Sequence, residues 1–263
     1  MVKIFIDPGH GGTDSGASGN GLLEKNVTLN IAKRVRDMLT NEYSNATVKM
    51  SRTGDQTVSL TKRTNDANSW GADYFLSIHI NAGGGTGYED YIHNTLSDSS
   101  RTAKLRNTIH QEIIKLNNLQ NRGKKKANFH VLRESHMPAM LTENGFIDTK
   151  ADADKMKSNT WLNNVARGHV NGLAKALGLK KKQETGIFYR VITGSFSKKA
   201  NAEERKRALE THGFESFIET YTSSGTTYYR VITGSFKSLD NAEERVAKLK
   251  AKGFDSFIVV QRT

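Results

Sequence analysis

The chain has 263 residues, which is enough for one full catalytic domain and a smaller module. It contains no cysteine, which excludes a cysteine nucleophile, a thiolate metal site and disulfide cross-links, so any metal ligands are His, Asp or Glu. The formal net charge is +12, which favours an anionic partner such as nucleic acid, a membrane surface or an acidic polymer, unless it only keeps the protein soluble.

No apolar run approaches the ~20 residues that a membrane-spanning helix requires, so we expect no membrane span. Met1 to Asp7 lead directly into a strand-like run, without the basic region, the longer apolar region and the cleavage site of a secretory signal peptide. We therefore expect a protein that either works in the cytoplasm or reaches the outside of the cell by lysis or an aided route.

Three short apolar runs each end on a residue that can bind a metal ion or carry a proton. The first runs from Lys3 to His10, the second from Tyr74 to His79 and the third from Pro138 to Glu143. Runs of this length are typical of buried strands, and in α/β sheets functional groups gather beyond the carboxyl ends of the strands. We expect the three runs to deliver their last residues to one edge of a sheet.

Two helices are predicted by apolar residues at helical spacing. The first carries on one face Val27, Ile31, Val35 and Leu39. The second begins near residue 160 and ends before Gly178, a natural C-terminal stop. The alternation of strands and helices predicts an α/β domain over residues 1–179, with a mixed, mostly parallel sheet flanked by helices.

His10, Glu24 and His79 form a candidate set of metal ligands. Glu24 lies just before the first helical run, and each histidine is followed by a glycine-rich segment. Two imidazoles and a carboxylate match catalytic zinc sites, which use three protein ligands and leave one position for water. Glu143 then remains free to take a proton from that water, because zinc lowers the pKa of bound water to about 7. The alternative is that His10 has only a structural role, because a single histidine at the end of a strand is more often structural than a ligand.

The C-terminal part contains an internal repeat. Residues 180–187 are polar, charged and without periodicity, and they are predicted to be a linker. Within residues 188–263, the eight residues from Tyr189 recur identically from Tyr229. Each unit is predicted to form strand, turn, helix and strand. One unit alone could not bury its apolar face, so we expect the two to pair into one small α+β domain of two βαβ repeats.

Four aromatic residues of the repeats are candidate ligand contacts: Tyr189, Phe196, Tyr229 and Phe236. Aromatic rings on a sheet in a basic setting stack on bases in RNA-recognition modules, and they stack on sugar rings equally well. The repeated sequence Arg-Val-Ile-Thr-Gly-Ser-Phe has a single aromatic residue, where the RNA-binding signature requires several. The sequence therefore favours a sugar ligand and leaves RNA binding as the alternative.

The motifs of residues 1–178 together resemble the zinc-dependent N-acetylmuramoyl-L-alanine amidases of bacterial cell-wall turnover. The matching segments occur in order: Asp7-Pro8-Gly9-His10-Gly11-Gly12, Glu24, Ser51-Arg52, Ser59-Leu60 with Arg63, Ala67-Asn68, Ala72-Asp73, Ser77-Ile78-His79 with Asn81-Ala82, Val131-Leu132-Arg133, and Pro138-Ala139 with Glu143, Gly145 and Phe146. The resemblance implies Zn²⁺ on His10, Glu24 and His79. It also implies Glu143 as catalytic acid and base, and cleavage of the amide between N-acetylmuramic acid and L-alanine. Thr142 and Asn144 depart from the pattern, because family members usually carry aliphatic residues beside the catalytic glutamate.

The repeats are similar to sporulation-related repeat domains, which bind peptidoglycan glycan strands. The two resemblances imply a cell-wall hydrolase whose catalytic domain takes the stem peptide while the repeats hold the glycan strand. They imply a secreted or cell-wall protein without a signal peptide and without a nucleic-acid partner, and tandem repeats that fold together suggest a monomer. Two alternatives are a peptidase or deacetylase with the same metal site, and an inactive wall-binding protein, which would require a site residue to be missing.

Other charged residues have both a structural and a functional interpretation. Arg52 and Arg63 match the family pattern, although arginines near strand ends often hold loops through backbone carbonyl groups. The basic triplet at 124–126 could meet an anionic wall polymer or simply be solvated. Glu89 could bind substrate or help to end the glycine-rich loop, and His93 could be a further site histidine or, more simply, a surface or groove residue.

Overall fold

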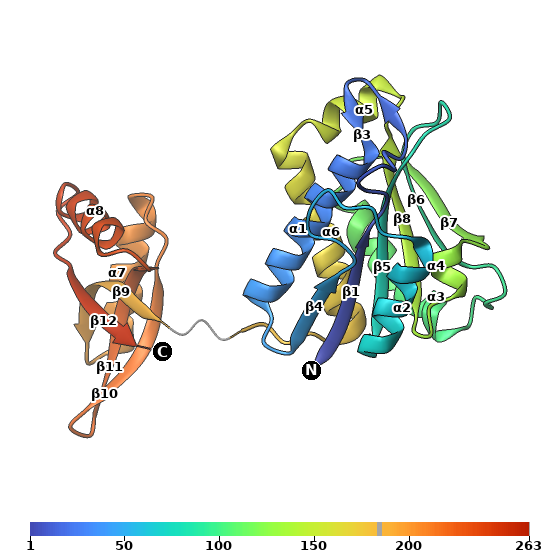
Figure 1. Ribbon diagram of the computed structural model, residues 1–263. Coiled ribbons are helices and arrows are strands. Elements are labelled where there is room, and N and C mark those ends of the chain that lie inside the picture. The colour runs from blue at the N-terminus through green and yellow to red at the C-terminus, as the bar shows by residue number, and fades with distance from the viewer. Residues whose placement is uncertain (183–185, 263) are drawn as a thin grey trace. The chain divides into compact units, whose positions relative to one another are not determined.

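The computed structural model of the chain describes residues 1–182 and 186–262. The chain divides into two compact units, residues 1–182 (unit 1) and residues 183–263 (unit 2), which Figure 1 shows in the colours of the sequence. None of the described helices is long and apolar enough to cross a membrane.

Unit 1 is built on a six-stranded sheet in the order β4-β1-β5-β8-β6-β7. The strands are β1 (Val2–Pro8), β4 (Ala46–Met50), β5 (Tyr74–Asn81), β6 (Tyr88–His93), β7 (Asn121–Ala127) and β8 (Ala139–Phe146). β8 and β6 are antiparallel, and all other neighbours in this sheet are parallel. Two short antiparallel strands, β2 (Ser18–Gly19) and β3 (Leu22–Leu23), lie between β1 and the first helix. The expected mixed, mostly parallel sheet is confirmed.

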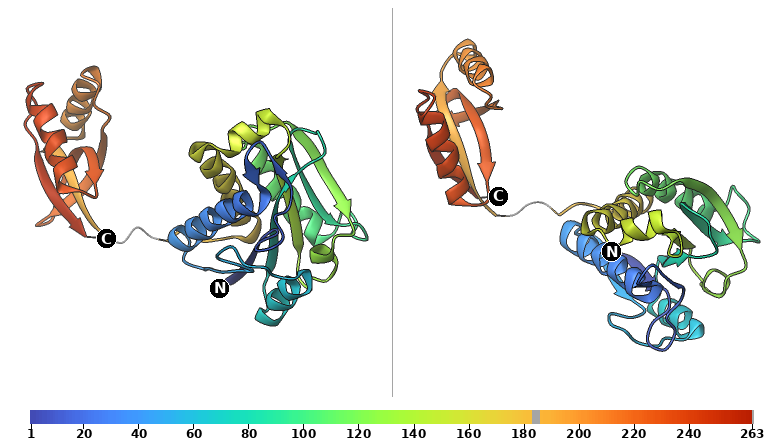
Figure 2. Two further views of the ribbon diagram at one scale, coloured as in Figure 1. Left: turned by 45° about the horizontal axis from the view of Figure 1, so that its top comes forward. Right: turned by 90° about the horizontal axis from the view of Figure 1, so that it is seen from above.

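Helices cover both faces of this sheet. They are α1 (Glu24–Glu42), α2 (Leu60–Trp70), α3 (Arg101–Ile114), α4 (His130–Arg133), α5 (Lys150–Met156) and α6 (Asn159–Leu177). Alternate residues of β1 enter two separate apolar clusters: Ile4 and Ile6 pack with residues of α1, α3 and α6, whereas Phe5 packs with residues of α2 and α4. Figure 2 shows α1 beside α6, with α2 apart from both. Because side chains alternate across a strand, the two clusters lie on opposite faces.

The apolar stripes that predict α1 and α6 are the buried faces of these helices. At most 5% of the surface is exposed at Val27, Ile31, Val35 and Leu39. α6 ends at Gly178, whose φ of 64° lies in the left-handed region. Two glycines within α6 let α3 approach closely, since a Cβ at Gly168 would lie 2.9 Å from Ile113 Cα and one at Gly172 would lie 2.7 Å from Ile109 Cα.

Unit 2 contains the same strand–helix–strand arrangement twice. Its elements are β9 (Ile187–Phe196), α7 (Lys199–Thr211), β10 (Phe217–Ser223), β11 (Thr226–Phe236), α8 (Leu239–Lys250) and β12 (Phe257–Arg262). They form one antiparallel sheet in the order β10-β11-β9-β12, and both helices contribute to one apolar cluster. At the central strand pair, Tyr229 faces Phe196 and Phe236 faces Tyr189, as expected for two repeats related by an approximate two-fold axis. The predicted α+β fold of two βαβ repeats is confirmed.

The predicted linker at 180–187 lies partly outside the described residues, which omit 183–185. At its start, Lys180 O accepts a hydrogen bond from Ser44 N at 2.9 Å, and Lys182 N donates one to Glu42 O at 2.7 Å. Residues 180 and 182 are therefore tied to the connection between α1 and β4. At its end, β9 begins at Ile187. The linker and the domain boundaries at 179 and 188 stay predictions.

A buried histidine joins α6 to β8. His169 exposes none of its surface, and its Nδ1 lies 2.8 Å from the carbonyl oxygen of Val165. Its Nε2 lies 3.2 Å from Thr142 Oγ1, which accepts a hydrogen bond from Asn144 Nδ2 at 3.1 Å. Side chains alternate along β8, so Thr142 and Asn144 face the layer of α1, α3 and α6, and Glu143 faces the opposite side of the sheet. Burial lowers the pKa of His169 to about 4, so its imidazole is neutral in the folded protein at neutral pH.

Acid should therefore destabilise unit 1 through His169. The unfolded chain takes up this proton below the ordinary pKa of 6.5 and the folded protein only below about 4. The free energy of unfolding thus falls between these two pH values, by about 3 kcal/mol in total. We expect His169→Gln to lack this component of the acid sensitivity.

The measurement is denaturant unfolding with a chelator present at about pH 7 and about pH 4, comparing the variant with the unsubstituted protein. Tryptophan fluorescence follows unit 1 alone, because both tryptophans, Trp70 and Trp161, belong to it. An equal acid-induced loss of stability in the two proteins would contradict the assignment of this component to His169.

Candidate metal centre

Three metal-type side chains meet at one edge of the unit 1 sheet. His10 follows β1, His79 lies near the end of β5, and Glu24 is the first residue of α1. Glu24 Oε2 is 3.2 Å from His10 Nε2, and Glu24 Oε1 is 3.0 Å from His79 Nδ1. The ligand atoms of all three residues lie within 4.8 Å of one another, and no second group of three such residues is found within residues 1–182 and 186–262.

The backbone after β1 is shaped to place His10. His10 has a φ of 62°, in the left-handed region that favours glycine, and Gly11 and Gly12 follow with positive φ. Gly9 leaves room for the neighbouring imidazole, because a Cβ there would lie 2.3 Å from His79 Cε1. A non-glycine residue in this conformation costs about 1–3 kcal/mol and persists only where its surroundings hold it.

Arg52 and Arg63 hold this loop through its carbonyl groups. Arg52 Nε donates to Pro8 O at 3.1 Å, and Arg63 donates to Pro8 O and His10 O at 2.8 Å each. Arg63 also forms a buried ion pair with Asp7 at 2.7 Å. The structural interpretation of both arginines is confirmed, and their side chains act on His10 through the backbone.

Further hydrogen bonds orient the donors. Asp14 Oδ2 lies 2.8 Å from His10 Nδ1, which leaves Nε2 for Glu24 and for a metal ion. Glu24 Oε2 accepts from Ala17 N at 2.8 Å, and Glu24 Oε1 accepts from Ile80 N at 3.0 Å. A carboxylate on the second ring nitrogen is the usual partner of a metal-binding histidine. The sequence carries no signal for Asp14, because its role depends on the turn that brings residue 14 back to residue 10.

The charges of these groups stabilise one another. Burial lowers the pKa of His10, but hydrogen bonds and charge from Glu24 and Asp14 outweigh burial and raise it to about 9. The pKa of His79 is also raised, because Glu24 and Glu143 outweigh burial. Burial would raise the pKa of Glu24, but hydrogen bonds from both imidazoles hold it well below its usual range. Glu24 is thus ionised, and the site favours positive charge next to it.

The three donors fit a zinc ion. Zinc–ligand bonds of about 2.0–2.1 Å at tetrahedral angles separate two ligand atoms by about 3.3 Å. His10 Nε2 lies 3.2 Å from Glu24 Oε2 and His79 Nδ1 lies 3.0 Å from Glu24 Oε1, and one ligand atom from each of the three residues lies within 4.8 Å of the other two. Two nitrogens and one carboxylate oxygen are a common donor set for catalytic zinc, which keeps a fourth position for water or substrate.

Glu143 lies next to this group on β8. It is the register partner of His79 in β5, so the two side chains share one face of the sheet. Its Oε2 is buried and has no hydrogen-bond partner among the described residues. Burial is the main cause that raises the pKa of Glu143 to about 7. The structure therefore places a carboxyl group with one unpartnered oxygen next to His79, and its pKa near 7 suits proton exchange at neutral pH.

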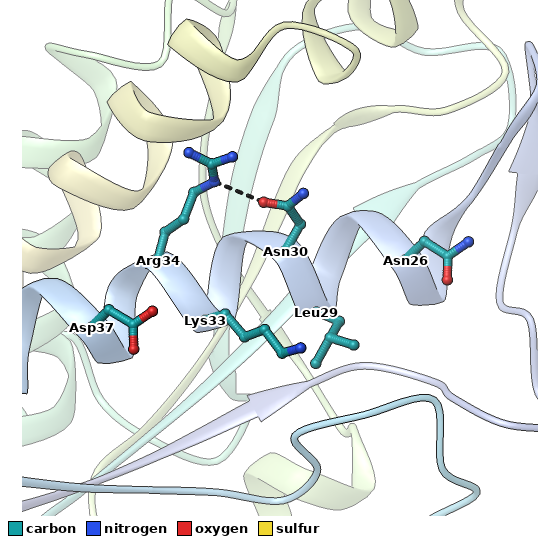
Figure 3. Close-up of a pocket in the computed structure, with 6 residues that line it drawn as sticks. All are labelled: Asn26, Leu29, Asn30, Lys33, Arg34 and Asp37. Carbon is teal, nitrogen blue, oxygen red and sulfur yellow. Dashed lines mark hydrogen bonds between the residues drawn. The ribbon is translucent and has the colours of Figure 1, made fainter.

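His93 lies away from this group. It lines a hollow of about 390 Å³ with residues such as Arg101, Arg133 and His136, and with Pro138 and Ala139 at the start of β8, whereas Glu143 lies near the strand's end. The structure thus favours the groove interpretation of His93. A second hollow, of about 360 Å³, is lined by residues of α1 alone and contains no group of metal-type donors (Figure 3).

The four aromatic residues singled out in the repeats are partly buried in unit 2. Tyr189, Phe196, Tyr229 and Phe236 all pack against the apolar cluster that includes α7 and α8. Their contact with a ligand stays a prediction. Two other rings of unit 2, Phe217 and Phe257, were not among the sequence candidates, and their exposed fractions are 46% and 49%. The sequence feature that could have pointed to these two rings is the Ser-Phe-Ile segment, which contains them and occurs in both repeats.

The fold and the site can be compared with known proteins. Residues 4–175 match the N-acetylmuramoyl-L-alanine amidase family, and residues 185–260 match the SPOR domain. The chain therefore belongs to the N-acetylmuramoyl-L-alanine amidases, and its substrate is peptidoglycan.

Two relatives match most of the chain, and a solved catalytic domain matches about two thirds of it. The chain is 56% identical over 218 residues to the sporulation-specific N-acetylmuramoyl-L-alanine amidase of Bacillus subtilis (strain 168), a match that covers 83% of this chain and 84% of that protein. It is also 56% identical over 218 residues to the amidase CwlM of Bacillus licheniformis, covering 83% and 85%. The solved catalytic domain of CwlV, an amidase from Bacillus (Paenibacillus) polymyxa var. colistinus, has a TM-score of 0.65 at 31% identity, covering 68% of this chain and 100% of that one.

Proposed function

We propose that this amidase is a zinc enzyme in which His10, Glu24 and His79 hold the metal ion and Glu143 moves the proton. The observation that carries the proposal is the pairing of His79 with Glu143 across β5 and β8, beside three donors whose ligand atoms lie within 4.8 Å of one another. The bond cleaved is the amide between the lactyl group of N-acetylmuramic acid and L-alanine. A peptidase or deacetylase could use the same donors, but membership of the amidase family favours this amide.

Each step of the proton transfer has a residue in place. A bound zinc ion would lower the pKa of a water molecule to about 7 and polarise the carbonyl group of the amide. Glu143, whose Oε2 has no other described partner, accepts a proton from the attacking water. It then returns this proton to the amide nitrogen, so that the C–N bond breaks and L-alanine leaves with a neutral amine. His10 and His79 stay fixed meanwhile by Asp14, Glu24 and the loop contacts.

We propose that unit 2 binds the glycan strand on the face of its sheet that no helix covers. One row of this face runs across all four strands in the order Phe217, Ile232, Ile192 and Phe257. The next residues along β10 and β12, Ile218 and Ile258, pack with the helices, so the row faces the other way. Ile192 and Ile232, in the middle of the row, are buried at 1% and 0% exposure, so only the two phenylalanine rings at its ends are open to a ligand. Sugar rings can stack on these two rings, and RNA binding is the alternative.

The proposed functions of the two units indicate where the enzyme acts. The catalytic unit takes the stem peptide, the repeat unit takes the glycan strand, and the enzyme works in the cell wall, where it would act as an autolysin outside the membrane. The name of the B. subtilis relative supports a role in sporulation. The repeats complete their sheet within one chain, which supports a monomer.

Removal of a proposed ligand should remove the metal ion. We expect His10→Ala and His79→Ala to lose both zinc and amidase activity, because two remaining ligands hold the ion poorly. A chelator should abolish the activity of the unsubstituted protein, and added zinc should restore it. Zinc content is measured by atomic emission and activity by mass spectrometry of digested peptidoglycan. His93→Ala, in the hollow near the start of β8, is the matched control and should keep both.

Glu143→Gln should behave differently from the ligand variants. We expect a zinc content close to that of the unsubstituted protein and activity lower by about 100-fold or more, the scale of a lost general base. If His79→Ala keeps its zinc, or if Glu143→Gln loses zinc, the assignment of ligands and base is wrong.

Replacement of the two exposed rings should weaken glycan binding. We expect Phe217→Ala combined with Phe257→Ala to bind peptide-free glycan strands more weakly, by about 30-fold or more, in a sedimentation assay, taking the scale of base stacking, about 1–3 kcal/mol per aromatic ring, for each of the two rings. Leu239→Ala, an equally exposed apolar residue at the start of α8, is the control. Tyr189→Ala combined with Tyr229→Ala tests the partly buried rings separately.

Added salt separates sugar stacking from polyanion binding, because only the second falls steeply with ionic strength. Tighter binding to RNA than to glycan strands at physiological salt would overturn the assignment of unit 2 to glycan.

A further inference from the structure

His79 in β5 and Glu143 in β8 are register partners, and a cluster of charged residues extends from Glu143 across β6 to β7. Glu89 in β6 is the register partner of Glu143 in β8, so their side chains share one face and lie about 5 Å apart at Cβ. Glu89 is 2% exposed, and both of its oxygens are occupied. Oε1 accepts from Asn81 Nδ2 at 2.9 Å and from the Tyr91 hydroxyl at 2.7 Å.

Two cations from β7 meet the other oxygen of this carboxylate. Glu89 Oε2 accepts from Arg122 Nε at 2.7 Å and from Lys125 Nζ at 2.5 Å. One negative charge is therefore shared by two positive charges, which leaves an excess of one positive charge. The side chains of Arg122 and Lys125 remain 32% and 37% exposed, so an anion in solution can reach them.

These two cations differ from their neighbours in the basic segment. Lys124 and Lys126 alternate with Lys125 along β7, and each has its own partner away from Glu89. Lys124 Nζ donates to Asn107, a residue of α3, and Lys126 pairs with the exposed Asp98. Only the middle lysine of the triplet thus reaches Glu89, the register partner of Glu143; Lys125 itself pairs with Tyr91, two residues further along β6.

Arg122 has further capacity to bind an anion. Its guanidinium group lies 4.9 Å from the ring centroid of Phe146, the last residue of β8. A guanidinium carries five N–H donors, and the described residues accept from two of its nitrogens, Nε at 2.7 Å and Nη1 at 3.4 Å. A planar group of this kind binds a carboxylate with two parallel hydrogen bonds.

The position of Arg122 and Lys125 relative to Glu143 indicates which part of the substrate they contact. The zinc donors lie on the β5 side of Glu143, and the cations come from β7, about two strand spacings or 10 Å from β8. A substrate whose scissile amide lies at Glu143 has a neutral sugar on one side and a peptide on the other. The peptide is the side that carries carboxylates, within a few bonds of L-alanine.

We propose that Arg122 and Lys125 bind a free carboxylate of the stem peptide next to L-alanine, and that the enzyme therefore prefers acidic stem peptides to amidated ones. Glu89 is a positioning residue in this arrangement, because it holds both cations at the edge of the site. The proposal rests on the proposed function of unit 1.

The test compares two muramyl tripeptides that differ only in whether the glutamyl α-carboxyl group is free or amidated. With the zinc-loaded full chain, we expect kcat/KM to be about tenfold or more higher for the acid, mainly through a lower KM, as for one charge-assisted hydrogen-bonded pair. Arg122→Gln and Lys125→Gln should each lower this acid-to-amide ratio to about three or less. Each variant leaves Glu89 one cation, so the buried carboxylate stays paired.

Lys124→Gln, on the same strand with its partner in α3, is the matched control and should keep the ratio. A second readout uses calorimetry with Glu143→Gln, which should bind the acid about tenfold more tightly than the amide, and this difference should disappear when Lys125→Gln is added. A ratio near one in the unsubstituted protein would overturn the proposal, as would variants that lower kcat equally for both tripeptides. Failure to cleave either tripeptide would contradict the proposed function instead.

Discussion

The carboxylate of Glu24 is the buried charge on which the edge of the sheet depends. It is 3% exposed, and it accepts hydrogen bonds from two backbone N–H groups. A carboxylate removed from water requires positive charge or donors around it, and His10 supplies these from the loop after β1 and His79 from β5. The strained loop at His10 and the arginines that hold it follow from the same requirement. The pKa values of His10 and His79 are raised, so protons on these imidazoles supply the positive charge next to Glu24. A metal ion bound here would supply that charge instead.

The strand order explains how one edge serves both the metal donors and a second charged group. β1, β5 and β8 are parallel, so their C-terminal ends deliver His10, His79 and Glu143 together. β6 is antiparallel to β8, and it is therefore the start of β6 that reaches this edge with Glu89. In the proposed mechanism, the sequence across the sheet runs from the metal donors through Glu143 to the two cations, which is the order of carbonyl, amide nitrogen and peptide that we propose for the substrate.

Much of this site could be predicted from local sequence, because His10, His79 and Glu143 each end an apolar run and strand ends gather at a sheet edge. The role of Asp14 and the row from Glu89 to Arg122 could not, because they depend on a turn and on pairing between distant strands. Strand formation by β7 also decides that only alternate members of the lysine triplet share a face. In unit 2, Tyr189 and Phe196 are seven positions apart and would face opposite sides of a regular strand. Both Tyr189 and Phe196 nevertheless pack against the apolar cluster of the helices. The pairing of β9 with β11 contains register shifts, so the regular alternation of side chains does not predict which face each ring occupies.

The central claim is the ligand set of the metal ion, and X-ray absorption at the zinc edge of the full chain carrying one zinc tests it most directly. The account predicts a first shell of nitrogen and oxygen at about 2.0–2.1 Å, with the multiple scattering of two imidazoles. It also predicts that His79→Ala, which holds the ion poorly, loses this two-imidazole scattering once unbound zinc has been removed. A first shell with three imidazoles, or a spectrum that His79→Ala leaves unchanged, would contradict it.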